Sequence, residues 1–196
     1  IQIKIDKQIH NIIYITHTMN NNILVFDLET IGLPKYRNAK PFHSYCYEQA
    51  RIIEIGYVII NTSGEVLKSV NHFVKYDKTI NIENSYIHGI TNEMVTEHGV
   101  MIDDVLDELT NDLINVDTIV AHNIEFDYNV LLSEVYRKYN NFKHLLGMLY
   151  SKDLHCTMQI GKKYMSSGKY PKLVELHQLL FDKVWVQTHR ALDDVN

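Results

Sequence analysis

The chain has 196 residues, enough for one substantial core and too few for two full domains. Hydrophobic residues make up 45% and charged residues 22%, which excludes disorder for most of the chain. The net charge of −5 makes the molecule a poor general binder of duplex phosphates, so phosphate chemistry would need local positive charge or bound cations.

Two cysteines, Cys46 and Cys156, make neither a disulfide framework nor a zinc pattern, so we expect a reducing compartment, cytoplasmic or otherwise intracellular. No run approaches the ~18 apolar residues of a membrane helix, so no membrane partner is expected. Residues 1–18 lack the apolar block and cleavage site of a signal peptide. We expect an N-terminal appendage at 1–18 and a single domain over 19–196, with Met19 as a candidate start.

The first half of this domain predicts three strands. Residues 23–30 form an apolar strand that ends in acidic side chains, and residues 31–50, with one glycine and two prolines, predict a long loop. Residues 51–61 and 66–76 predict two further strands, which a Ser63-Gly64 turn makes antiparallel.

The second half alternates helices with a strand. In chain order we expect a short helix after Thr91, a helix over 101–114, a short strand over 118–123, a helix over 126–139, a loop, a segment at 154–164, a helix opened by Pro171, and a last helix begun within 189–196. A strand meander followed by this alternation predicts an α/β fold with a mixed sheet flanked by helices.

Asp27 and Glu29 are two residues apart in the first predicted strand, so their side chains lie on one face. Their neighbours Val25, Phe26 and Leu28 are apolar, which sets the acids in a buried context. Two ionised carboxylates held close together need a cation, and hard oxygen ligands suit Mg²⁺ or Mn²⁺. The alternative is a strand end that reaches water, where the pair needs no cation.

Asp127 stands early in an amphipathic helix whose apolar face includes Phe126, Val130 and Leu131. It is a second candidate ligand. The alternative is a first-turn acid that interacts with the helix dipole, as is common, while Asn123 is available as a cap.

His189 and Asp194 are five residues apart and do not share a helix face. We therefore place His189 just before the last helix and Asp194 inside it. An imidazole that titrates near neutral pH is suited to take a proton from water. The alternative is a structural or exposed histidine, because the chain has 11 of them.

Four segments follow one another in a recognisable order. They are Asp27–Thr30 (D-x-E-T), Ile87–Thr91 (IHGIT), His122–Asp127 (H-N-x-x-F-D) and His189–Asp194 (H-x-A-x-x-D). Together they resemble the DEDDh exonuclease family, which includes the proofreading epsilon subunit of bacterial DNA polymerase III, RNase T and oligoribonuclease. The resemblance covers about residues 22–196. A sister class has tyrosine where this chain has Arg190, so the histidine class fits.

The resemblance implies an RNase H-like fold and two bound Mg²⁺ or Mn²⁺ ions. It assigns the metal ligands to Asp27, Glu29, Asp127 and Asp194, and the deprotonation of the attacking water to His189. Two metals ~4 Å apart stabilise the attacking and leaving oxygens of a phosphoryl displacement.

The resemblance also implies substrate contacts. The backbone around Leu28 and Thr30 would approach the 3′-terminal nucleotide, and His88 would lie beside its base or sugar. Phe126 would stack on a base, or else pack in the core as helix-start phenylalanines commonly do.

The loop at 31–50 is long for a minimal member of this family. It interleaves the basic residues Lys35, Arg37 and Lys40 with Tyr36 and Tyr45, a mixture suited to tracking a single strand. The alternative is a solvated loop. Since the chain stops two residues after Asp194, in a helix just begun, we expect the native protein to continue.

The sequence therefore predicts a 3′→5′ exonuclease on nucleic-acid 3′ ends, with single-stranded DNA preferred and a polymerase as a candidate partner. The closest alternative is the same chemistry on RNA or oligoribonucleotides, because only pocket shape reads the 2′-hydroxyl. A non-catalytic nucleic-acid-binding or polymerase-binding module and a metal-stabilised structural domain are the alternatives from other classes.

Overall fold

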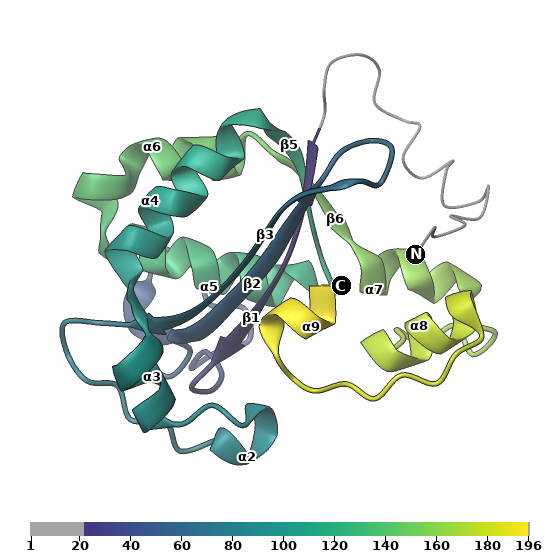
Figure 1. Cartoon of the computed structure of the whole chain (residues 1–196), viewed down its shortest axis with the longest axis horizontal. Helices are drawn as coiled ribbons and strands as arrows, with labels where there is room; N and C mark the ends of the chain where they lie inside the picture. Colours follow the sequence, from purple (N-terminus) through teal and green to yellow (C-terminus); the bar gives the residue numbers. More distant parts are fainter. Residues whose placement is uncertain (1–21, 196) are drawn as a thin grey trace.

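Figure 1 shows the protein as a computed structural model that describes residues 22–195. The appendage expected at residues 1–18 lies outside the described residues. The described chain folds into one six-stranded sheet with helices on both faces. This arrangement confirms the predicted mixed α/β sheet flanked by helices.

The strands lie side by side in the order β4-β3-β2-β1-β5-β6. Their bounds are β1 Asn22–Thr30, β2 Ile52–Ile60, β3 Val66–Lys75, β4 Val100–Met101, β5 Val116–Ala121 and β6 Asp153–Cys156. β1, β2 and β3 form an antiparallel meander, whereas β5 runs parallel to β1 and β6 runs parallel to β5. β1 is therefore the central strand, where the antiparallel and parallel halves of the sheet meet.

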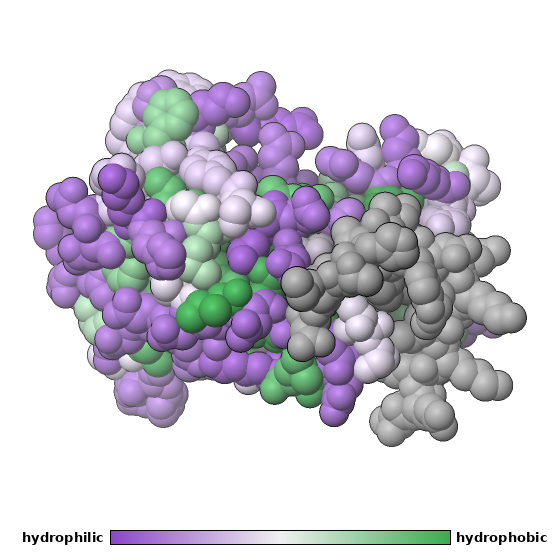
Figure 2. Space-filling model, turned by 90° about the horizontal axis from the view of Figure 1, so that it is seen from above, coloured by the Kyte–Doolittle hydropathy of each residue, from purple (hydrophilic) through white to green (hydrophobic). Residues whose placement is uncertain are grey.

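The helices of the described chain are mostly short. They are α2 Ser85–His88, α3 Asn92–His98, α4 Ile102–Asp112, α5 Ile124–Arg137, α6 Tyr139–Tyr150, α7 Thr157–Gly161, α8 Leu173–Phe181 and α9 Ala191–Val195, with 3-10 turns η1 Ser44–Tyr47, η2 Leu113–Asn115 and η3 Lys162–Tyr164. Seen from above, the described surface is mainly hydrophilic with small hydrophobic patches (Figure 2).

Alternation along β1 separates the two faces of the sheet. Leu24, Phe26 and Leu28 are buried in the main core, which side chains of α4, α5 and α6 complete. Because side chains alternate along a strand, Asp27 and Glu29 point to the opposite face, on which α9 packs (Figure 1). The same strand thus supplies the core on one face and acidic groups on the other.

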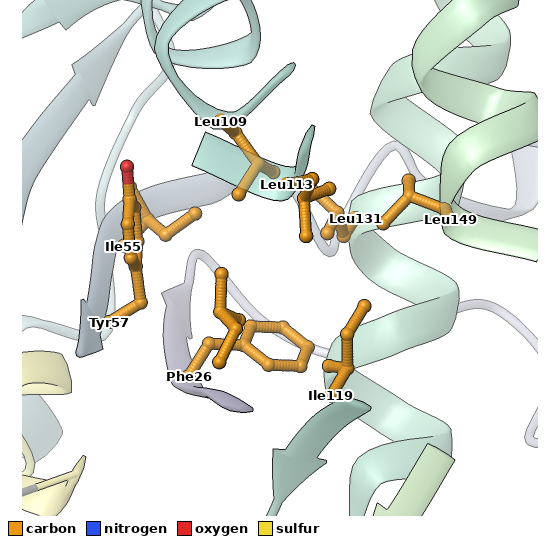
Figure 3. A pocket seen from close by; sticks show the side chains of 9 residues that line it. Phe26, Ile55, Tyr57, Leu109, Leu113, Ile119, Leu131 and Leu149 are labelled. Atoms are coloured by element: carbon orange, nitrogen blue, oxygen red, sulfur yellow. The ribbon is translucent and has the colours of Figure 1, made fainter. Parts of the chain in front are cut away.

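Side chains fill the core almost completely. A cavity of about 10 Å³ remains among apolar side chains that include Phe26, Ile119 and Leu131 (Figure 3). This volume is near the minimum that a single water molecule needs, so the cavity has no room for a nucleotide.

The structure confirms most of the predicted elements. β1, β2, β3 and β5 lie within two residues of the predicted strands, and α4, α5 and α8 within about two residues of the predicted helices. The short helix expected after Thr91 is α3, and the Thr91 hydroxyl caps it by accepting from the Met94 N–H at 3.3 Å.

Several elements differ from the prediction. The loop expected after residue 139 is helix α6, whose apolar Phe142, Leu145 and Leu149 face the core; Gly147 lowers the helix propensity of this segment and obscures the signal. The short strands β4 and β6, and the single turn α2, leave no periodicity to detect. The loop predicted over 31–50 contains η1.

Candidate active site

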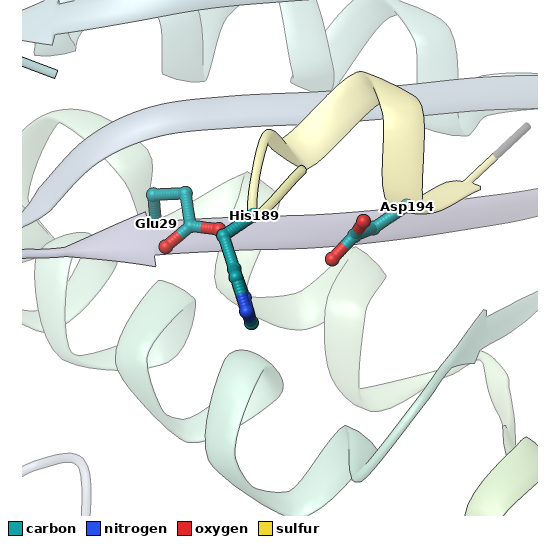
Figure 4. Close-up of side chains that lie close together, drawn as sticks. All are labelled: Glu29, His189 and Asp194. Carbon is teal, nitrogen blue, oxygen red and sulfur yellow. The ribbon is translucent and has the colours of Figure 1, made fainter. Parts of the chain in front are cut away.

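Side chains from the first strand and from the C-terminal segment meet beside the carboxyl end of β1 (Figure 4). One ligand atom from each of Glu29, His189 and Asp194 lies within 4.8 Å of the other two. Glu29 is the penultimate residue of β1, His189 precedes α9 by two residues, and Asp194 lies within α9. The C-terminal segment thus returns to the first strand.

Asp27 and Asp127 extend this acidic group. Asp27 lies on the same face of β1 as Glu29, and Asp127 is 4% exposed in the first turn of α5. The charge of Asp27 acts on Asp127, and the charge of Asp194 acts on Asp27. The structure therefore brings Glu29, His189 and Asp194 within ligand distance of one another, with Asp27 and Asp127 close enough to interact electrostatically with this group.

Burial and mutual repulsion raise the pKa values of these carboxyls. Burial, and then the charge of Asp194, raises the pKa of Asp27 to about 8. Burial, and then the charge of Asp27, raises the pKa of Glu29 to about 8. Burial also raises the pKa of Asp127 well above its ordinary value, with Asp27 adding to the effect, and it raises the pKa of Asp194. Since the anions repel one another, a cation among them would stabilise the ionised state.

The donor set fits a divalent metal. Asp194 Oδ2 accepts a hydrogen bond from the Gln187 side chain, but Asp194 Oδ1 is buried with no hydrogen-bond partner among the described residues. A buried carboxylate oxygen without a partner is costly unless it binds a cation. Oxygen ligands predominate, and these are preferred by hard cations such as Mg²⁺ and Mn²⁺.

A glycine lets α9 approach the sheet closely. Gly56 of β2 is the strand partner of Asp27, and a Cβ on this residue would lie 2.3 Å from the Leu192 backbone nitrogen. That distance is incompatible with any side chain. The absence of a side chain at Gly56 therefore allows the backbone of α9 to lie against β2, beside the acidic strand end.

A buried ion pair holds the start of α9. Glu54 is fully buried and is the strand partner of Glu29. Its carboxylate accepts from Arg190 Nη2 at 2.6 Å and from Arg190 Nε at 3.1 Å, and also from the Ala191 N–H at 2.9 Å. Asn71 donates a further hydrogen bond at 3.0 Å, and the Arg190 guanidinium lies over the Phe73 ring at 5.1 Å. Residues on two strands, β2 and β3, thus fix the segment between His189 and Asp194.

The sequence prediction missed this ion pair. In the sequence, Arg190 only separates the histidine class from the tyrosine class, and Glu54 belongs to none of the four motifs. A signal was present, because Glu54 is the one charged residue in the apolar strand IIEIGYVII. Charged residues are rarely fully buried unless they are paired, so this glutamate implied a partner that only the fold identifies.

The backbone around His189 has an unusual conformation. His189 has a φ of +53°, in the left-handed region that few non-glycine residues adopt. The neighbouring Thr188 hydroxyl donates to the Asp193 carboxylate at 2.8 Å, which closes the turn before α9. His189 itself is exposed while Asp194 is half-buried. The predicted placement, with His189 before the helix and Asp194 inside it, is confirmed.

The other residues predicted to contact substrate have different environments. The Leu28 side chain is buried in the core, so only its backbone is available for contact. The Thr30 hydroxyl donates to the Gly32 carbonyl oxygen at 2.7 Å. Phe126 is half-buried and packs against the main core, so packing accounts for its apolar character, as the alternative interpretation expects.

His88 lies in a buried position close to the final motif. It is 2% exposed, and its Nδ1 accepts from the Ile90 N–H at 3.1 Å, while its Nε2 has no hydrogen-bond partner among the described residues. Burial lowers the pKa of His88; Glu54 opposes this shift, whereas Arg190 and His189 add to it. Asn84, one turn earlier, donates to the Thr30 carbonyl oxygen at 3.0 Å and thereby joins this segment to the end of β1.

Comparisons with known proteins agree with this geometry. The family model RNase T, described as "Exonuclease", matches residues 24–196, which include all four motifs. No curated protein sequence matches significantly. Within the described residues, no helix is long and apolar enough to cross a membrane.

The fold is shared with solved exonucleases. Escherichia coli Exonuclease I in complex with a dA16 oligonucleotide matches with a TM-score of 0.64 and 16% identity, over 89% of this chain and 38% of that one. The zinc-bound form of the E. coli Exonuclease I–single-stranded DNA complex matches with 0.66 and 15%, over 89% and 38%. Exonuclease X in complex with 5′-overhanging duplex DNA matches with 0.54 and 22%, over 88% and 84%.

The chain thus spans about 38% of the length of the Exonuclease I chains and most of the length of Exonuclease X. At these identities the structural matches establish the RNase H-like fold, whereas the family model covers nearly the whole described chain. With its four carboxylates and a histidine before the last helix, the protein belongs to the exonuclease family, in its DEDDh class.

Proposed function

We propose that this protein is a metal-dependent 3′→5′ exonuclease that hydrolyses phosphodiester bonds at nucleic-acid 3′ ends, with single-stranded DNA as its preferred substrate. The convergence of Glu29, His189 and Asp194 within 4.8 Å carries this proposal. A binding module would need neither a strongly repelling group of acids nor an exposed histidine beside it.

Asp27, Glu29, Asp127 and Asp194 would hold two Mg²⁺ or Mn²⁺ ions. When bound, the ions would supply charge stabilisation at the attacking and leaving oxygens of the phosphodiester. The raised pKa values of Asp27 and Glu29 support this assignment, because they indicate anions that lack a counter-charge. The zinc-bound form of E. coli Exonuclease I supports metal binding by this fold, without identifying the ion that this protein uses.

His189 would accept the proton of the attacking water. Its imidazole is exposed, so substrate and water can reach it, and it lies beside Glu29 and Asp194. The Glu54–Arg190 pair would keep the residue at a fixed distance from the carboxylates, because it anchors the next residue along the chain.

The 3′-terminal nucleotide would lie over the end of β1. We expect it to meet the backbone of Leu28 to Thr30, and it would reach His88 only if the buried, unpartnered Nε2 of that residue becomes exposed on binding. A stacking role for Phe126 is the weaker part of this assignment, since Phe126 already packs against the core.

The choice of DNA as the proposed substrate rests on the similarity of the fold to that of solved DNA exonucleases. Exonuclease I is solved with DNA oligonucleotides and Exonuclease X with overhanging duplex DNA. RNA is the alternative substrate within the same chemistry. An intracellular location is supported by the free, buried thiols of Cys46 and Cys156, and a polymerase partner rests only on the resemblance to the epsilon subunit.

The test compares end-labelled single-stranded DNA and RNA with Mg²⁺ and with chelator. We expect metal-dependent release of 5′-mononucleotides from a free 3′-hydroxyl, faster on DNA, with little release from a 3′-blocked strand or a circle. Faster release from RNA would mean that RNA, and not DNA, is the preferred substrate. Efficient cutting of the circle, or equal rates in chelator, would overturn the proposed function.

A further inference from the structure

The segment at 31–50 is not a solvated loop. Cys46, Tyr47 and Ala50 are buried in the main core, and η1 packs against α5. The Tyr47 hydroxyl donates to the Ala39 carbonyl oxygen at 2.7 Å, and Arg137 of α5 pairs with Glu48 at 2.5 Å. The segment is therefore a fixed surface layer along α5, whose exposed side chains project from a held backbone.

Exposed aromatic rings cluster on this layer. Tyr36, Phe42 and Tyr45 are 58%, 55% and 64% exposed. His43 connects two of them, because its ring centroid lies 4.4 Å from that of Phe42 and 5.6 Å from that of Tyr45. We call Tyr36, Phe42, His43 and Tyr45 the aromatic ridge.

The ridge continues onto helices of the main fold. Phe42 packs edge-on against Tyr136 of α5 at 6.2 Å, and the Tyr136 hydroxyl lies 2.9 Å from that of Tyr150 on α6, a residue that is 55% exposed. Large aromatic rings are ordinarily buried, so a series of exposed ones is unusual for a surface that contacts only water.

Positive charges without ion-pair partners accompany the ridge. Lys35 lies over the Tyr36 ring at 5.4 Å, Arg37 lies in the turn that the Ala39 N–H closes on the Tyr36 carbonyl oxygen, and Lys40 begins the next turn. Within residues 22–195 none of these three forms an ion pair, whereas Arg51 and Arg137 are both paired with carboxylates. In a chain of net charge −5, three unpaired cations beside exposed rings make a local positive surface.

The layer lies along α5, whose first turn carries Asp127. Arg137 in the last turn of α5 donates to the Ser44 carbonyl oxygen, and Phe42 reaches Tyr136 in the same turn. At the other end, the carboxylate of Glu125 acts on the Tyr47 hydroxyl, which bonds Ala39. The 14 residues of α5 span about 20 Å, so the layer extends over several nucleotides from the candidate active site.

We propose that the aromatic ridge and its three cations, Lys35, Arg37 and Lys40, form a binding surface for the single strand upstream of the 3′ end. Bases stack on the exposed rings while phosphates meet the cations, a combination that binds single strands without reading sequence. The inference rests on the proposed function, since it places this strand as the continuation of the substrate whose 3′ end lies at Glu29.

Binding tests the surface separately from cleavage. Fluorescent DNA strands of about 3 to 20 nucleotides are titrated with full-length protein in chelator at several salt concentrations. Neutralising Lys35, Arg37 and Lys40 together to glutamine should reduce the slope of log affinity against log salt by roughly 2, since each phosphate contact contributes about 0.7. Tyr36→Ala and Tyr45→Ala should each weaken binding to long strands about fivefold or more.

The control neutralises Lys78, Lys143 and Lys169, exposed cations outside the ridge, and should keep the wild-type slope. With Mg²⁺, the ridge variants should cleave a trinucleotide at the wild-type rate while losing the advantage of long strands. An unchanged slope and unchanged length dependence would overturn the proposal, and so would equal losses on short and long substrates. If the wild-type protein binds long strands through the ridge but cleaves none, the proposed function fails and the binding surface stands.

Discussion

The two halves of the candidate active site are held in different ways. Asp27, Glu29 and Asp127 come from β1 and α5, whose apolar side chains lie in the main core. His189 and Asp194 come from a C-terminal segment whose contact with the sheet depends on the Glu54–Arg190 pair and on the space above Gly56. One half is therefore positioned by the burial of apolar surface and the other by a few polar contacts.

The α9 half of the site depends on fewer stabilising contacts than the core half does. A helix as short as α9, with five residues, has little stability of its own and depends on tertiary contacts. Substitutions in the core half should remove function without moving the backbone, because many apolar contacts remain. Substitutions that reach the α9 half should change metal affinity and geometry together.

Loss of a core-half ligand should have the largest effect. Asp127→Ala removes the most buried of the four carboxylates, so cleavage should fall below detection. The fold should persist, and stability in chelator should hold or rise, because one of several repelling charges is gone. Single-turnover cleavage and thermal melts measure the two effects.

The matched control is Asp104→Ala, which removes an exposed acid from the first turn of α4, away from the site, and should cleave normally. Near wild-type Mg²⁺-dependent cleavage by Asp127→Ala would show that this residue is no ligand.

Substitution of His189 should have the next largest effect. His189→Ala should lower kcat about 10²–10⁴-fold with substrate and metal binding largely kept, since only the proton acceptor is lost. His98→Ala, at an exposed position on α3, serves as the control.

The competing interpretation is that His189 only shapes the turn before α9. That role predicts a less stable protein whose folded fraction cleaves at the wild-type rate. Thermal melts and single-turnover cleavage rates distinguish the two interpretations. If folded, metal-loaded His189→Ala protein cleaves at the wild-type rate, His189 is not the general base.

Substitutions of Arg190 test whether the Glu54–Arg190 ion pair holds the α9 half of the site in place. Arg190→Lys keeps the charge but loses the two-pronged contact with Glu54, so metal affinity should fall about 10- to 100-fold. Arg190→Ala leaves Glu54 buried and unpaired, which should also cost about 3–5 kcal/mol of unfolding free energy. Mn²⁺ titration calorimetry and urea unfolding provide the readouts.

A second buried pair supplies the control for this experiment. Arg51 forms a similar two-pronged contact with Glu134, which is 1% exposed, and Glu134 lies in the later turns of α5. Arg51→Lys should lose stability but keep metal affinity. Equal effects of the two substitutions on metal affinity would mean that α9 is not held by its ion pair.

The last expected effect is a pH dependence of the metal-free protein. The pKa values of Asp27 and Glu29 are about 8 in the folded state and near 4 when unfolded. The folded state therefore binds more protons between these values, so stability is fully present below pH 4 and falls as the pH rises toward 8. Thermal melts in chelator from pH 5 to 8.5 should show this fall.

Added Mg²⁺ should reverse the trend, because it replaces the protons as the counter-charge. Asp27→Asn, which cannot ionise, should flatten the metal-free profile. A metal-free melting temperature that rises with pH would contradict the raised pKa values.

Local pattern determined much of this protein. Period-two alternation identified β1 and placed Asp27 and Glu29 on one face, and helical spacing identified α4 and α5, because these signals depend only on neighbouring residues. The order of the four motifs identified the family. The turn before α9 was also predictable, since five residues do not return to the same helix face.

Tertiary structure decided how these pieces act together. Glu54 and Arg190 lie 136 residues apart, so no local stretch of sequence reveals that they pair. Gly56 likewise matters only because the backbone of α9 packs against it. The raised pKa values of Asp27 and Glu29 likewise arise from burial and from charges brought together across the fold. The sequence motifs predict which acidic residues matter. Long-range packing brings these residues into one site, and local propensity does not encode that packing.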